Sequence, residues 1–164
     1  MISETIQKAI NDQINAELYS SYLYLSMSAW FEDGNFKGFA KWMKVQTDEE
    51  REHAEKLYKF LVDRGGRVTL KAIAAPPVDF KSVQDIFEQS YAHEQKVTAL
   101  INGIYDMAVK EKDFATQEHL NWFVKEQVEE EASASEMVHQ VKLAENKPGN
   151  LMYLDRHAAK RGGE

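Results

Sequence analysis

Four long amphipathic stretches, joined by two short connections and one long one, limit what this chain can fold into more than any other feature. Apolar residues recur at helical spacing over about Ser3 to Asp33, Phe36 to Gly65, Ser82 to Lys112 and Asp113 to Asn146. Ser82 and Asp113 are good candidate N-caps, and Gly34-Asn35 and Gly65-Gly66 are turn signals. The pattern predicts an all-α protein.

The connections predict how the helices are arranged. The first and second stretches, and the third and fourth, have short links and should pair antiparallel. The link from Gly65 to Lys81 is seventeen residues long, and at about 3.3 Å per residue it spans roughly 55 Å. A helix of about 28 residues is only ~42 Å long, so the link can cross the whole bundle. We expect one domain over residues 1–164, with a four-helix bundle at about 3–146 and a short fifth helix at about 149–160.

Composition narrows the partners and the compartment. The chain has no cysteine, which excludes disulfides, thiolate metal sites and redox thiols. Its 20 Lys and Arg against 27 Asp and Glu give a formal charge of −7, which argues against nucleic acid because phosphate binding needs a basic face. No apolar run approaches membrane-spanning length, and the N-terminal residues lack the features of a signal peptide. We therefore expect a cytoplasmic protein with neither a membrane nor a nucleic-acid partner.

Each amphipathic stretch carries polar residues in the middle of its apolar face. At ~100° per residue, Glu17 shares a face with Ile6, Ile10, Ile14, Tyr24 and Phe31. Glu50, with His53 beside it, falls among Phe39, Met43, Ala54, Leu57 and Leu61. Glu94 falls among Val83, Phe87, Val97, Ile101 and Tyr105. Gln127, with Glu130 beside it, falls among Leu120, Phe123, Val124, Ala134 and Val138. All these polar groups lie near mid-helix, so they should meet at one level of the bundle.

These carboxylates predict a metal site in the core. One glutamate on an apolar stripe is more often a tolerated polar core residue than a ligand. Four at one level are different, because burying each unpaired carboxylate costs several kcal/mol and a whole domain is stable by only about 5–15 kcal/mol. No Lys or Arg lies on these stripes near that level. Two divalent cations would neutralise four carboxylates, and one imidazole with oxygen donors suits iron or manganese.

The spacing Glu50-x-x-His53 is the most specific part of the pattern. Positions i and i+3 place both side chains over one helical turn, facing the bundle axis. Alone the spacing is common by chance, but partner carboxylates on three other helices make it a strong signal. The fourth stretch breaks the symmetry, because Gln127-Val128-Glu129-Glu130 stands where a second such motif would lie. One metal would then have His53 and the other mostly carboxylates, so we expect two affinities.

Four segments are highly specific when taken together: Asn15 to Tyr24, Glu49 to Ala54, His93-Glu94 and Glu126 to Glu131. They closely resemble the non-haem bacterial and archaeal ferritins, and the resemblance covers essentially the whole chain. It implies a ferritin-like four-helix bundle and a ferroxidase centre with two iron ions per subunit. The residues of that centre would be Glu17, Glu50, His53, Glu94, Gln127 and Glu130. The resemblance assigns Glu17 and His53 to the first iron, Glu94 and Glu130 to the second, and Glu50 to a bridge.

The same resemblance implies a third iron site and a nearby tyrosine. Glu49, Glu126 and Glu129, with Glu130, would form the third site, whereas an acidic run without such a resemblance is usually a solvated helix face. Tyr24 would lie beside the centre, where a core aromatic is the ordinary interpretation. Bacterioferritins fit less well, because they have a second Glu-x-x-His and a haem-ligating Met where this chain has Arg51. We therefore expect no haem.

Together these features predict an iron-storage protein with ferroxidase activity. Fe(II) would be oxidised by O2 or H2O2 and deposited as ferric oxide-hydroxide, and the resemblance implies a hollow homo-oligomer of 24 subunits. The link and the C-terminal segment hold apolar residues that one bundle has little room to bury: Val68, Leu70, Ile73, Leu151, Met152, Tyr153 and Leu154. Two alternatives stay open: a di-iron or di-manganese redox enzyme acting on peroxide or an organic substrate, and a structural shell subunit with an idle site.

Overall fold

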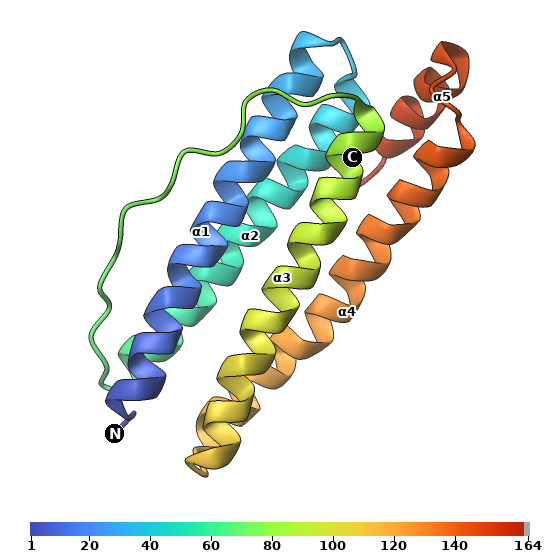
Figure 1. Cartoon of the computed structure of the whole chain (residues 1–164). Helices are drawn as coiled ribbons and strands as arrows, with labels where there is room; N and C mark the ends of the chain where they lie inside the picture. The colour runs from blue at the N-terminus through green and yellow to red at the C-terminus, as the bar shows by residue number, and fades with distance from the viewer. Residues whose placement is uncertain (163–164) are drawn as a thin grey trace.

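The computed structural model describes residues 1–162, which form five α-helices and no strand (Figure 1). The helices are α1 (Glu4–Asp33), α2 (Lys37–Asp63), α3 (Val83–Lys110), α4 (Phe114–Leu143) and α5 (Pro148–Ala158). α1 pairs antiparallel with α2, and α3 with α4, so the predicted all-α bundle with one long crossover and a short fifth helix is confirmed. Among the residues described, no helix combines the length and the apolar character needed to cross a bilayer.

The helix ends follow from local capping chemistry. Ser82 Oγ accepts a hydrogen bond from the Asp85 amide at 3.1 Å, and Asp113 Oδ1 accepts one from the Thr116 amide at 3.0 Å. Both residues are therefore the N-caps that the sequence predicts. α3 and α4 end two to three residues earlier than expected, at Lys110 and Leu143, because Lys112, Glu145 and Asn146 adopt positive φ angles that a helix cannot contain.

The crossover link runs as an extended chain along the outside of α1 (Figure 1). Polar side chains of α1 satisfy its backbone in place of a neighbouring strand. Asn11 Nδ2 donates to the carbonyl of Arg67 at 3.0 Å, and Asn11 Oδ1 accepts from the amide of Thr69 at 2.7 Å. Farther along, Ser26 Oγ donates to the carbonyl of Pro77 at 2.6 Å. These contacts fix the path of the link from one end of the bundle to the other.

α5 docks on the start of α2. Asp155 Oδ1 accepts a hydrogen bond from the backbone amide of Phe39 at 2.8 Å, and a Cβ at Gly38 would lie only 1.6 Å from the Asp155 carbonyl oxygen. Leu151 is buried in this contact and belongs to the core of its own chain. The expectation that Leu151 is left over for an interface is therefore wrong, whereas Met152 and Tyr153 are exposed as expected.

A polar layer divides the core into two apolar clusters. One cluster contains Met27, Phe31, Phe39 and Phe87. The other contains Ile10, Leu57, Ile101 and Phe123. Along each long helix the buried residues change from one cluster to the other where the polar groups predicted from the sequence occur. Not every residue of the predicted apolar faces is buried, because Val124 is 36% exposed and Tyr105 and Val138 are only partly buried.

Candidate metal centre

Six side chains named from the sequence are buried together in this polar layer, each between 1% and 5% exposed. They come from all four long helices, and they are Glu17, Glu50, His53, Glu94, Gln127 and Glu130. The predicted convergence of polar groups at one level is thus what the structure contains. The part that each side chain plays as an iron ligand stays a prediction.

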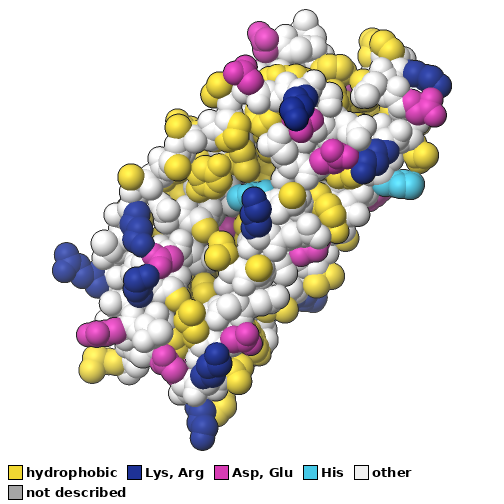
Figure 2. All heavy atoms as spheres, viewed as in Figure 1, with side chains coloured by type: hydrophobic (Ala, Val, Ile, Leu, Met, Phe, Trp, Pro, Cys, Tyr) yellow, Lys and Arg dark blue, Asp and Glu magenta, His cyan; other side chains and the backbone are white. Residues whose placement is uncertain are grey.

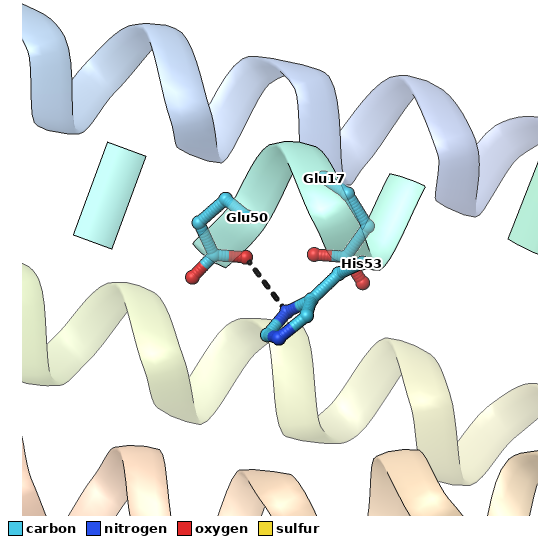
Figure 3. A group of neighbouring side chains, drawn as sticks. All are labelled: Glu17, Glu50 and His53. Atoms are coloured by element: carbon cyan, nitrogen blue, oxygen red, sulfur yellow. Dashed lines mark ion pairs between the residues drawn. The ribbon is translucent and has the colours of Figure 1, made fainter. Parts of the chain in front are cut away.

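Glu17 on α1 and Glu50 and His53 on α2 form a compact group (Figure 3). Their possible ligand atoms all lie within 4.8 Å of one another, and His53 Nδ1 is 3.3 Å from Glu50 Oε2. Oε2 of Glu17 is buried and has no hydrogen-bond partner among the described residues, and the buried Oε2 of Glu50 has only the His53 ring beside it. A buried carboxyl oxygen whose hydrogen bonding is incomplete is costly. A bound cation would remove that cost, so this donor set fits a metal ion.

Two buried glutamines, which the sequence analysis did not identify, hold the other carboxylate oxygens. Gln13 Nε2 donates to Glu17 Oε1 at 2.8 Å. Gln46 Nε2 donates to Glu50 Oε1 at 3.0 Å and to Glu130 Oε2 at 2.8 Å, so it joins α2 to α4. Each glutamine lies four residues before the glutamate of its own helix, on the same face. That i−4 spacing is the sequence signal that could have revealed them.

Glu94 is held differently from Glu17 and Glu50, since both of its oxygens are engaged. The Tyr24 hydroxyl donates to Glu94 Oε1, and Gln127 Nε2 donates to Glu94 Oε2 at 3.2 Å. Gln127 Nε2 also lies 3.2 Å from Thr98 Oγ1. Tyr24 therefore lies beside the centre, as the resemblance implied, and it contacts the centre through Glu94.

Glu130 and His53 belong to a second group that also includes Glu126. The possible ligand atoms of these three residues lie within 4.8 Å of one another. The resemblance assigns Glu126 to a third iron site. In the structure Glu126 also lies close to His53, a residue of the main centre. Trp122 packs edge-on against His53, with 5.3 Å between the ring centroids.

Burial and mutual repulsion favour the protonated forms of several carboxyl groups in the metal-free centre. Burial, followed by the charge of Glu50, raises the pKa of Glu17 and of Glu94 well above the usual range. The same causes raise the pKa of Glu130 to about 7. Burial opposes the charged form of His53, but Glu50 and other carboxylates outweigh it and raise the His53 pKa. Burial also opposes ionisation of Glu50, yet His53 and Gln46 hold its pKa below the usual value. Binding of dications would release these protons.

The residues expected at a third iron site lie nearer the surface. Glu49 is partly exposed, Glu126 is half-buried and Glu129 is exposed. Burial raises the pKa of Glu49, opposed by Arg161 and helped by the charge of Glu126, so Glu49 and Glu126 are close enough to interact. Arg161 Nη2 donates to Glu49 Oε2 at 2.7 Å. The four apolar faces carry no Lys or Arg near the level of the centre. Arg161, which contacts Glu49, belongs instead to the segment after α5.

Comparison with known proteins decides the family. Residues 7–144 match the sequence model of the Ferritin-like domain. The chain belongs to the ferritin family. It is 43% identical to the bacterial non-heme ferritin of Bacteroides fragilis over 161 residues, which cover 98% of this chain and 100% of that protein. It is 41% identical to the bacterial non-heme ferritin of Staphylococcus haemolyticus over 133 residues, 81% of this chain and 80% of that one.

Solved structures of ferritins have the same fold. The open pore ferritin of the hyperthermophilic archaeon Archaeoglobus fulgidus superposes with a TM-score of 0.97 and is 47% identical, covering 98% of this chain and 99% of that chain. The predicted resemblance to non-haem ferritins and the predicted bundle are therefore confirmed for this member of the family.

Proposed function

We propose that this ferritin oxidises Fe(II) at the buried carboxylate centre and stores the product as ferric oxide-hydroxide inside a hollow homo-oligomer. The observation that carries the proposal is the polar layer itself. Four carboxyl groups are only 1% to 5% exposed. One Glu17 oxygen has no hydrogen-bond partner among the described residues, and one Glu50 oxygen has only the His53 ring at 3.3 Å. An apolar core would be more stable without them, so their presence is best explained by a cation substrate.

The chain's own groups divide the work. Glu17 and His53 would hold the first Fe(II), Glu50 would lie between the two ions, and Glu94 with Glu130 would hold the second. Gln13 and Gln46 orient three of these carboxylates before any metal arrives. Each Fe(II) gives one electron to O2 or H2O2, and the protons displaced from the carboxyl groups are available to the reduced oxidant. In this proposal the fold contributes to catalysis by holding two cations side by side, where one oxidant molecule can reach both.

Storage requires a cavity, and exposed apolar groups support an assembly that would enclose one. Leu70, Val78 and Tyr153 are 65%, 70% and 72% exposed. Figure 2 shows hydrophobic side chains gathered along the groove between α1 and α3. A hollow of about 430 Å³ in this groove is lined by Tyr19, Leu23, Pro77, His93 and Leu100, among others. We propose a shell of 24 subunits, in which the link lies at two-fold contacts and α5 at the four-fold axes.

The test is aerobic Fe(II) oxidation by the purified metal-free protein, followed at the ferric absorbance and combined with metal analysis. Glu17→Ala, Glu50→Ala and His53→Ala should each abolish rapid oxidation and keep the helical circular dichroism of the parent. Glu52→Ala removes an exposed carboxylate from the same helix and should oxidise iron at the parent rate. Parent-like rates in all three centre variants would mean that the reaction occurs elsewhere. A stable monomer or dimer in sedimentation would exclude storage and leave a small di-metal redox enzyme.

A further inference from the structure

Arg161 is a cation placed on the acidic rim of the centre. Its Nη2 donates to Glu49 Oε2 at 2.7 Å, and its guanidinium carbon lies 4.1 Å above the centroid of the Trp42 ring. The Arg161 side chain is only 20% exposed, and its Nη1 is buried with no hydrogen-bond partner among the described residues. Arg161 lowers the pKa of Glu130 as well as that of Glu49, so its charge reaches the inner group.

The position of Arg161 is set by the docking of α5. Leu151 and Ala158 bury one face of α5, and Asp155 accepts from the Phe39 amide at the start of α2. Arg161 follows three residues after the end of α5, where the backbone forms turns rather than a helix. Residues 159–162 can therefore move away from Glu49 while α5 keeps its own contacts.

A divalent cation bound at Glu49 would compete with Arg161 for the carboxylate. A guanidinium keeps its positive charge at every pH at which proteins fold, so it cannot yield its place by losing a proton. The Oε2 atom that it occupies is a candidate ligand atom, and a dication held there would repel Arg161 at short range. A dication on Glu49 would therefore weaken the Arg161 contact.

We propose that Arg161 is a built-in counter-cation of the outer acidic site, the group formed by Glu49, Glu126 and Glu129. Arg161 pairs with Glu49 in the metal-free protein and leaves it when a divalent cation binds there. This inference rests on the proposed function, because it takes the buried centre as the iron site, and it adds Glu49 as a ligand beside that centre. Arg161 thereby sets the affinity of the outer site below that of the inner pair. Its release frees residues 159–162, so the chain segment after α5 reports how far the site is loaded.

The test uses the full-length, assembled, metal-free protein and Zn(II), a redox-inert probe, so that the readout does not depend on activity. Calorimetric titration of the parent should show tight binding at the inner pair and a weaker additional site. Arg161→Gln should strengthen the weaker site by roughly two- to fivefold, the effect expected for loss of one partly exposed ion pair. Arg161→Lys should stay close to the parent, and Lys160→Gln, which removes the exposed neighbouring charge, should match the parent.

Hydrogen exchange and crystallography follow the segment directly. Amides of residues 159–162 should exchange faster in the parent once Zn(II) fills the weaker site, and equally fast in Arg161→Gln without Zn(II). Zinc anomalous density at Glu49 should coincide with an Arg161 side chain that has left it. Unchanged or weaker outer-site affinity in Arg161→Gln, or zinc at Glu49 with Arg161 still paired, would overturn the inference. Absence of zinc from the inner carboxylates of the parent would overturn the proposed function, and this inference with it.

Discussion

Replacing Glu130 by glutamine should change how the stability of the metal-free protein depends on pH. Glu130 is 5% exposed, and burial together with the charge of Glu50 raises its pKa from the usual 4.5 to about 7. A carboxyl group whose pKa rises on folding binds more protons in the folded state. Its stabilising contribution is therefore complete below the unfolded pKa and is lost as pH rises through the folded pKa. The difference, 7 minus 4.5, is about 2.5 units, or roughly 3 kcal/mol per subunit at 1.36 kcal/mol per unit.

Glutamine keeps the shape of the neutral acid and can still accept the hydrogen bond that Gln46 Nε2 gives to Glu130 at 2.8 Å. Near pH 4, below the unfolded pKa, the variant and the parent should be about equally stable. Near pH 8 Glu130→Gln should be more stable by up to about 3 kcal/mol. Urea unfolding of chelator-treated protein, at equal subunit concentration because assembly affects stability, measures the difference. Glu136→Gln, an exposed change on the same helix, should leave the parent profile unchanged. Parallel pH profiles for the parent and Glu130→Gln would refute the reasoning.

Three further predictions concern loading, docking and assembly. Gln127 and Glu130 stand where a second Glu-x-x-His would lie, so the second position has no imidazole. The His53 position should therefore fill first, and crystals grown at substoichiometric Zn(II) should show unequal occupancy; equal occupancy at every level would contradict this. Gly38→Ala should displace α5 and accelerate proteolysis of the C-terminal segment, because the added Cβ would meet the α5 backbone. Gly103→Ala is the matched control: the space around Gly103 is open, so this change should stabilise α3 by about 0.5–1 kcal/mol. Leu70→Glu should shift sedimentation toward smaller species, because Leu70 is 65% exposed; an intact large oligomer would argue against an interface there.

Periodicity predicts the bundle and the polar layer because the apolar face of each helix, and the polar residues within that face, are set by the sequence of that helix alone. A helical repeat places Glu17 or Glu94 on an apolar face whatever the partner helix is. Contacts across long sequence separations carry no such signal. Arg161 reaches Glu49 across 112 residues, and its arrival depends on how α5 docks. The misassignment of Leu151 has the same origin, because its burial depends on a contact between α5 and the rest of the bundle that composition does not encode.

The hydrogen bonds of the centre give a physical reason for its asymmetry. At the His53 end, Glu17 and Glu50 each have one oxygen fixed by a glutamine. The second Glu17 oxygen has no hydrogen-bond partner among the described residues, and the second Glu50 oxygen has only His53 Nδ1 at 3.3 Å. A cation arriving there would satisfy oxygens whose present hydrogen bonding is incomplete. At the other end, Tyr24 and Gln127 already donate to both oxygens of Glu94, so a cation must first replace a hydrogen bond. The same fold therefore presents one position that is costly to leave without metal and one that tolerates its absence, which favours sequential loading.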